Sequence, residues 1–128
     1  MSLFEKLFNS SDNEKTISKI EWKQLTNLEQ LNEIKAESNS KPVAIFKHSS
    51  RCIVSRMALK QFENEFDLKD KVTPYFLDLL EYRGVSNEIA NCFEVEHQSP
   101  QLLLIRNGKS IYDVSHNSID AEDLKRHI

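Results

Sequence analysis

The sequence predicts an α/β fold, a mixed sheet flanked by helices with the element order βαβαβαββα. One apolar run begins at Val43 and leads through a short serine-containing turn into an amphipathic helix. A second largely apolar run covers Val72–Leu79. Near the C-terminus the pair Asn107-Gly108 is a strong two-residue hairpin signal. Together these features indicate a parallel strand pair and an antiparallel hairpin in one sheet.

The first part of the chain divides into an extension and the start of the domain. Residues 1–15 are predicted to be an amphipathic and then polar N-terminal extension, and 16–128 a single domain. The extension has four apolar side chains that suit a short helix packed on the domain or on a partner: Leu3, Phe4, Leu7 and Phe8. We expect Ile17–Trp22 to form an edge strand.

The predicted helices alternate with the strands. Thr26 is expected to cap a helix with Leu28, Leu31 and Ile34 at helical spacing. The next helix opens at Cys52 and extends to about Glu65. The apolar positions that continue this helix are Met57, Leu59, Phe62 and Phe66. The remaining predictions are a helix at Asn87–Phe93, strands at Gln101–Arg106 and Ser110–Ser115, and a short helix from near Asp120.

Composition limits the functional class. The chain has 128 residues, a hydrophobic content of 39% and a net charge of −3, values that suit one globular domain and argue against general nucleic-acid binding. No apolar segment is long enough to span a membrane, and the first residues lack the apolar region of a signal peptide. Two cysteines suit a reducing compartment. We therefore expect a cytoplasmic protein, and a monomer.

Cys52 is the candidate nucleophile because it follows a strand and opens a helix. A helix N-terminus favours negative charge, and such surroundings raise the thiolate fraction of a cysteine. Four nearby side chains are candidates to support the thiolate or the substrate as cations: Lys47, Arg51, Arg56 and protonated His48. The alternative is that Cys52 is a small buried hydrophobic residue and that these charges are solvated. His48 precedes the turn, so its ring has the alternative of pointing away from the sulfur.

The strand order predicts that three segments meet at one end of the sheet. The central strand runs toward Cys52, the strand after Ser99-Pro100 begins at the same end, and Ser115-His116 finishes there. His116 is a candidate to stabilise the thiolate or to hold an anionic ligand; the alternative is a surface histidine that caps the last helix. A proline that enters a strand after a loop is a place for a cis bond, and we expect Pro100 to be cis.

Five short motifs, taken in order, carry a family resemblance. They are Phe46-Lys47-His48-Ser49, Cys52-x-x-Ser55, Ser86-Asn87-x-Ile89-Ala90, His97-x-Ser99-Pro100-Gln101 and Ser115-His116. This combination resembles the monothiol bacilliredoxins, the YtxJ-like family of the bacillithiol system within the thioredoxin-like superfamily. The chain departs from the usual family pattern because Arg51 replaces a threonine and Ile53 replaces a proline.

The resemblance implies a thioredoxin-like fold and a thiol-disulfide exchange. Cys52 would attack the mixed disulfide between a protein and bacillithiol, with bacillithiol as co-substrate and with no bound cofactor or metal. Bacillithiolated proteins and the low-molecular-weight thiol would be the partners. Ser55 replaces the second cysteine of a dithiol pair, and Ser99 and Pro100 would form the substrate groove. Lys47, Arg51 and Arg56 would bind the malate carboxylates of bacillithiol.

Other functions remain open at this stage. One is a monothiol glutaredoxin-like protein that uses glutathione or carries an iron-sulfur cluster. Another is a thioredoxin-like interaction module without catalysis. Cys92 is either a structural residue of the third helix or a resolving thiol. A phosphatase loop of the Cys-x5-Arg type is excluded because residue 58 is alanine, and the cysteines and histidines give no closely spaced zinc quartet.

Overall fold

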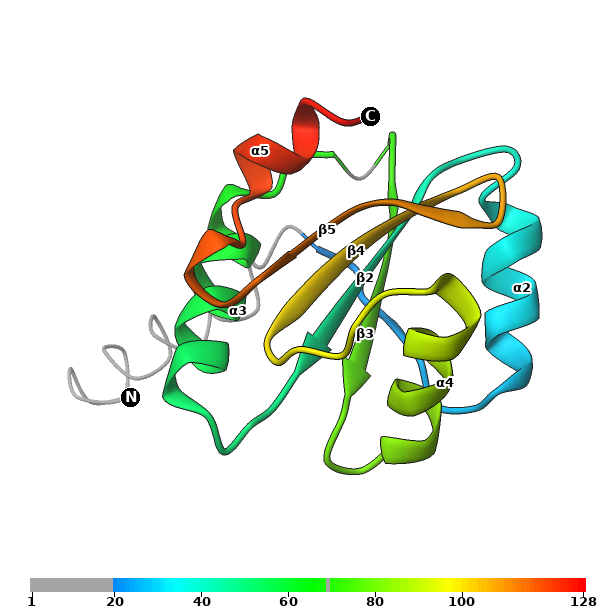
Figure 1. Cartoon of the computed structure of the whole chain (residues 1–128). Coiled ribbons are helices and arrows are strands. Elements are labelled where there is room, and N and C mark those ends of the chain that lie inside the picture. Colours follow the sequence, from blue (N-terminus) through cyan, green and yellow to red (C-terminus); the bar gives the residue numbers. More distant parts are fainter. Residues whose placement is uncertain (1–19, 69) are drawn as a thin grey trace, which may run out of the picture.

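A computed structural model describes residues 20–68 and 70–128. One mixed sheet has the order β1-β3-β2-β4-β5 (Figure 1). Its strands are β1 Lys23–Gln24, β2 Val43–His48, β3 Thr73–Asp78, β4 Gln101–Arg106 and β5 Lys109–Ser115. The helices are α2 Glu29–Glu37, α3 Ile53–Glu65, α4 Arg83–Phe93, the 3-10 helix η1 His116–Ser118 and α5 Ala121–Lys125. This order confirms the predicted α/β arrangement.

The central strand β2 explains why its sequence is apolar. It pairs in parallel with β3 and antiparallel with β4, and all six of its residues are buried. A strand with neighbours on both sides and helices on both faces has no solvent-exposed position, so it reads as a continuous apolar run. The strand nevertheless ends in two polar residues, Lys47 and His48.

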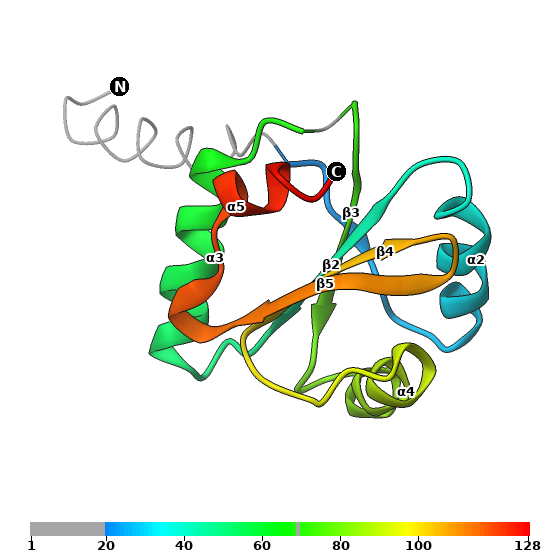
Figure 2. The ribbon, with the colours of Figure 1, turned by 45° about the horizontal axis from the view of Figure 1, so that its top comes forward.

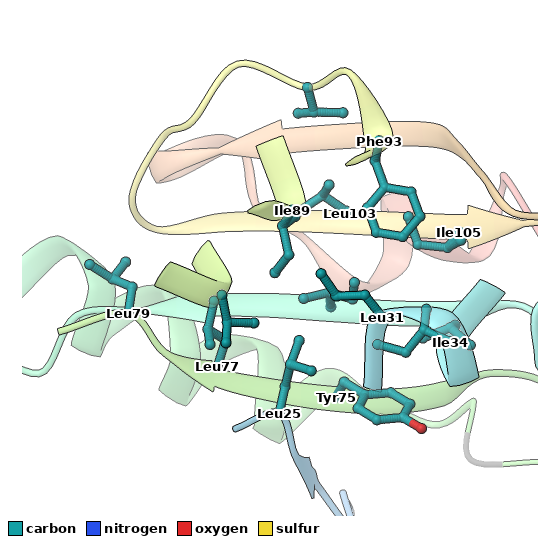
Figure 3. Packing of buried hydrophobic residues seen from close by; sticks show 14 residues of the cluster. Leu25, Leu31, Ile34, Tyr75, Leu77, Leu79, Ile89, Phe93, Leu103 and Ile105 are labelled. Atoms are coloured by element: carbon teal, nitrogen blue, oxygen red, sulfur yellow. The ribbon is translucent and has the colours of Figure 1, made fainter. Parts of the chain in front are cut away.

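Helices cover both faces of the sheet. Figure 2 shows α3 and α5 on one side and α2 and α4 on the other. On the α2 and α4 face, Leu31 and Ile34 of α2 and Ile89 of α4 lie over Leu77 and Leu103 of the sheet (Figure 3). The cluster on the α3 and α5 face has an aromatic centre, formed by Phe46, Phe62 and Phe66 with Trp22 at its side.

The hairpin between β4 and β5 has the predicted turn. Asn107 and Gly108 both have positive φ angles, 53° and 76°, which a two-residue type I′ turn requires. The turn is also attached to the end of α2. The N–H of Asn107 donates to the carbonyl of Ser38 at 2.9 Å, and the N–H of Gly108 donates to Ser38 Oγ at 2.8 Å.

The edge strand differs from its prediction. Within Ile17–Trp22 the described residues are 20–22, and the strand itself is formed by Lys23 and Gln24. Trp22 instead packs against the aromatic centre, and its Nε1 donates to Glu63 at 2.7 Å. Aromatic packing therefore determines the position of Trp22, and the pattern of apolar residues in the sequence did not reveal this packing. The predicted extension 1–15 lies outside the described residues.

Two helical details also differ from prediction. Thr26 does not cap α2, because the N–H of Gln30 donates to Asn27 Oδ1 at 3.1 Å and the helix begins at Glu29. Met57 was expected on the packed side of α3, but it is 67% exposed. Helix α4 also begins earlier than predicted, at Arg83. The bounds of α3 and the start of α5 after Asp120 agree with the sequence analysis.

Phe62 gives a test of the aromatic centre. Phe62→Ala should lower the free energy of unfolding by about 3–5 kcal/mol, because the ring is 1% exposed and its removal leaves a cavity. Met57→Ala, in the same helix, is the control and should change it by less than about 0.5 kcal/mol. Urea unfolding followed by circular dichroism measures both. Equal losses would contradict the assignment of Phe62 to the core.

Candidate active site

Cys52 is the residue that precedes α3. Its backbone is extended (φ −104°, ψ 122°), its carbonyl accepts the N–H of Arg56 at 3.0 Å, and its side chain is half-buried. No side chain caps this end of α3, and its first turn has no acidic residue. Cys52 therefore stands at the end of α3 where the N–H groups of the first turn favour negative charge. This is the arrangement that the sequence predicted.

Ser55 lies inside the protein and joins the first turn of α3 to β2. Its side chain is fully buried, and Oγ accepts the N–H of Ser49 at 3.0 Å. The same oxygen lies 2.8 Å from Nδ1 of His48. With the ring proton on Nε2, Nδ1 accepts the hydroxyl proton of Ser55, so the oxygen is used both as acceptor and as donor. The hydroxyl thus fixes the turn that carries Cys52.

His48 faces the α3 side of the sheet. Its ring lies against Phe76 and Phe46, with centroid distances of 5.5 and 6.5 Å. Burial is the main cause that lowers the pKa of His48; the negative charges of Asp78 and Glu63 act in the opposite direction. His48 is therefore neutral at neutral pH. The structure brings the ring to Ser55, three residues from Cys52, instead of into solvent.

Lys47 faces the other side of the sheet. It is fully buried, and Nζ lies 3.0 Å from Nδ1 of His97 and 3.3 Å from Oε1 of Gln101. Burial lowers the pKa of Lys47 to about 8. This environment differs from the exposed cation expected from the sequence, and a direct contact of Lys47 with a carboxylate of a ligand stays untested.

Ser99 and Pro100 stand at the start of β4. The bond between them is cis, as predicted, and the carbonyl of Pro100 accepts the N–H of His116 at 3.0 Å. In the register of the hairpin Gln101 lies opposite Ser115. The start of β4 and the end of β5 therefore meet, as the strand order predicted. Ser99 Oγ is buried and has no hydrogen-bond partner within residues 20–68 and 70–128.

His116 is exposed and opens η1 with a positive φ of 54°. It does not cap the last helix, which was the alternative expectation. That cap is Asp120, whose Oδ1 accepts the N–H of Glu122 at 2.9 Å. The His116 ring is thus left at the surface, on the segment that binds the backbone of Pro100.

Comparison with known families decides the relationship. The family model for the monothiol bacilliredoxin BrxC matches residues 23–124. The chain belongs to the monothiol bacilliredoxin family. The match includes both loops of the site, Cys52 with Ser55 and Ser99 with Pro100.

Solved structures agree with this fold. A thioredoxin-fold protein that has been assigned provisionally as an oxidoreductase is 28% identical, with a TM-score of 0.70 over 80% of this chain and 89% of that one. The thioredoxin of Malassezia sympodialis is 20% identical, with a TM-score of 0.65 over 83% and 86% of the two chains. The thioredoxin of Fasciola hepatica is 16% identical, with a TM-score of 0.63 over 83% and 95%. The thioredoxin-like fold predicted from the sequence is confirmed.

Two arginines flank the bacilliredoxin cysteine. Arg51 precedes Cys52 directly and Arg56 lies one turn into α3, and both are exposed. Neither forms an ion pair with a residue of the described ranges. Their guanidinium groups are accordingly accessible to an anionic ligand, while the positive charge of Arg56 also disfavours protonation of His48.

Cys92 lies far from this site in the fold. It is in the last turn of α4 and packs against the core on the α2 and α4 face, whereas Cys52 opens a helix on the opposite face (Figure 2). Lys35, near the end of α2, contacts both Cys92 and the ring of Phe93. Both thiols are free.

No group of three or more histidine, cysteine or acidic side chains is arranged to hold a metal ion among residues 20–68 and 70–128. Within the same ranges no helix combines the length and the apolar character that a membrane crossing needs.

The neutral state of His48 gives a prediction for the site. Its ring should titrate with a midpoint below the ordinary value of about 6.5, because burial disfavours the imidazolium. The unfolded chain then takes up the proton first, so the free energy of unfolding should fall as the pH drops from about 6.5 through the folded pKa. NMR titration of the ring measures the midpoint, with His48→Gln to assign the signal. A midpoint above 6.5 would contradict the buried neutral ring.

Proposed function

We propose that this bacilliredoxin removes bacillithiol from protein mixed disulfides through Cys52. The observation that carries the proposal is the pairing of one thiol at the N-terminus of α3 with Ser55 in the position of a second cysteine. Family membership supports the same chemistry. We also propose that the protein acts as a monomer in the cytoplasm, with bacillithiol as co-substrate and no bound cofactor.

The proposed exchange has two steps. The Cys52 thiolate attacks the bacillithiol sulfur of the mixed disulfide, a new sulfur-sulfur bond forms, and the protein thiolate leaves and takes up a proton. A second bacillithiol thiolate then attacks the bacillithiol sulfur bound to Cys52. That step releases the Cys52 thiolate and forms bacillithiol disulfide. Each step exchanges one disulfide for another, and the second bacillithiol molecule supplies the electrons that reduce the mixed disulfide.

Ser55 accounts for the need of an external thiol. An oxygen cannot form the internal disulfide that would release a substrate from Cys52, and this hydroxyl is already bound to His48 and to the N–H of Ser49. Cys92 lies on the other face of the sheet, which supports its interpretation as a structural residue. A small-molecule thiol is therefore the suitable second reactant.

The substrate side of the proposed site is the loop before β4. Ser99 would present backbone hydrogen-bonding groups to the incoming disulfide, beside Pro100, and His116 would help to hold an anionic group of the ligand. Arg51 and Arg56 would bind the malate carboxylates of bacillithiol, which is consistent with their exposed and unpaired guanidinium groups among the described residues.

The two cysteines allow a direct test. Cys52→Ser should abolish removal of bacillithiol from a modified protein, because no other thiol lies at the α3 terminus, whereas Cys92→Ser should keep nearly the full rate. Intact-mass spectrometry follows both the substrate and the mixed disulfide on Cys52. A trapped mixed disulfide with loss of turnover in Cys92→Ser would show that Cys92 resolves it. Equal activity of the wild type with a glutathionylated substrate would favour the glutaredoxin-like alternative.

The arginines give a second test. Arg51→Gln and Arg56→Gln should each raise KM for the bacillithiolated protein by about two- to fivefold, the size of an exposed ionic contact. The mixed disulfide of the same protein with β-mercaptoethanol, which has no carboxylate, is the matched control and should react equally well with all variants. The difference should also shrink at high salt, where exposed charges are screened. An equal loss with both disulfides would contradict a carboxylate contact.

A further inference from the structure

Lys47 ends the apolar part of β2 with a cation inside the protein. Its side chain is fully buried, and within the described ranges no carboxylate forms an ion pair with it. Burial of an unpaired ammonium costs free energy, so its hydrogen-bond partners determine what it does. Those partners are Nδ1 of His97 at 3.0 Å and Oε1 of Gln101 at 3.3 Å.

Both partners belong to the segment that carries Ser99 and Pro100. Gln101 also connects Lys47 to the start of this segment, because its Nε2 donates to the carbonyl of Glu96 at 2.9 Å. The segment 96–101 is therefore fixed at both ends, through Glu96 and His97 at its start and through Gln101 at its end. Both ends are connected to the ammonium group of Lys47 by hydrogen bonds. The lysine does not touch a reacting atom in this arrangement.

Resting on the proposed function, we propose that Lys47 is a positioning residue that holds the substrate loop 96–100 through Gln101 and neutral His97, and that protonation of His97 releases this hold. The inference uses a contact on the α4 side of the sheet, away from the α3 side where His48 and Ser55 fix the nucleophile.

The chemistry of the imidazole explains the release. Nδ1 has one lone pair, and it accepts the ammonium proton of Lys47 only while it is unprotonated. The charged groups that face the ring are Lys47 from β2 and Arg83 from α4, and both are positive. The neighbouring Ser86 Oγ, 3.5 Å from Nδ1, is uncharged. Burial, followed by these two cations, lowers the pKa of His97, and a proton on the ring adds a third positive charge to the cluster.

Binding of a bacillithiolated peptide to full-length Cys52→Ala protein tests the hold without any exchange step. Lys47→Met replaces the cation by an apolar chain of similar length and should weaken binding about tenfold, the size expected for a lost hydrogen bond to a charged group. A merely structural lysine predicts another result, because an apolar replacement of a buried charge often leaves stability unchanged or raised. Unchanged affinity in a folded Lys47→Met protein would overturn the proposal.

The pH dependence separates His97 from other groups. Affinity should fall as the pH is lowered below about 6.5, the ordinary value of a histidine, because the ring of His97 takes up its proton only below that value. His97→Asn keeps an acceptor oxygen that does not titrate, so its affinity should stay constant over the same pH range. His127→Asn, which changes an exposed ring beside Tyr112, should keep the dependence of the parent protein. A pH dependence that survives His97→Asn would overturn the release step.

Amide hydrogen exchange tests the hold without substrate. The amides of residues 96–99 should exchange about tenfold faster in Lys47→Met, and His97→Leu should give the same result if Lys47→Met does not fold. Unchanged exchange in the folded variant would overturn the positioning role. If the wild type neither binds the bacillithiolated peptide nor removes bacillithiol, the proposed function fails, while the exchange rates still decide whether Lys47 holds the loop.

Discussion

The carboxyl end of β2 places the strongest constraint on the site, because a strand with no exposed residue ends in two basic side chains. Backbone groups of β2 are satisfied by β3 and β4, but the side chains of Lys47 and His48 need partners of their own. Consecutive residues of a strand point to opposite faces. One polar side chain therefore enters each face of the sheet, and each face must supply a fixed partner.

The two partners organise the two loops that form the proposed site. On the α3 face His48 binds Ser55, and this contact fixes the turn that presents Cys52. On the α4 face Lys47 binds His97 and Gln101, which flank Ser99 and Pro100. The turn with the proposed nucleophile is thus fixed by His48, and the proposed substrate loop is fixed by the neighbouring Lys47. A shift of β2 by one residue would exchange the faces and remove both contacts.

The sequence was sufficient for most of the fold because its signals are local. The apolar run of β2, the Asn107-Gly108 turn and the opening of α3 at Cys52 each depend on neighbouring residues, and each was predicted correctly. The edge strand was placed wrongly, because Trp22 joins an aromatic cluster formed by residues distant in sequence. Thr26 was predicted to bind the start of α2, but Asn27 accepts the N–H of Gln30 there instead, and both residue types suit that position.

The site was predictable only in part, for a related reason. Cys52 and Pro100 stand out through their position next to a predicted strand, whereas the burial of Lys47 depends on Gln101, 54 residues later in the chain. A lysine at the end of an apolar run usually marks the exposed end of a strand. His97 and Gln101 stood in a recognised motif, but spacing alone did not reveal that they share Lys47 as a partner.

Ser55 stands in the position of a second cysteine and also has a structural role of its own. A cysteine at this buried position would place a weak donor and acceptor between His48 and the N–H of Ser49, where the hydroxyl now makes contacts of 2.8 and 3.0 Å. The serine thus strengthens the turn and at the same time removes the internal route to release. In the proposed exchange every turnover therefore needs an outside thiol, which must reach Cys52. Ile53 and Met57 are exposed at that end of α3 among the residues that the structure describes, which is consistent with such access.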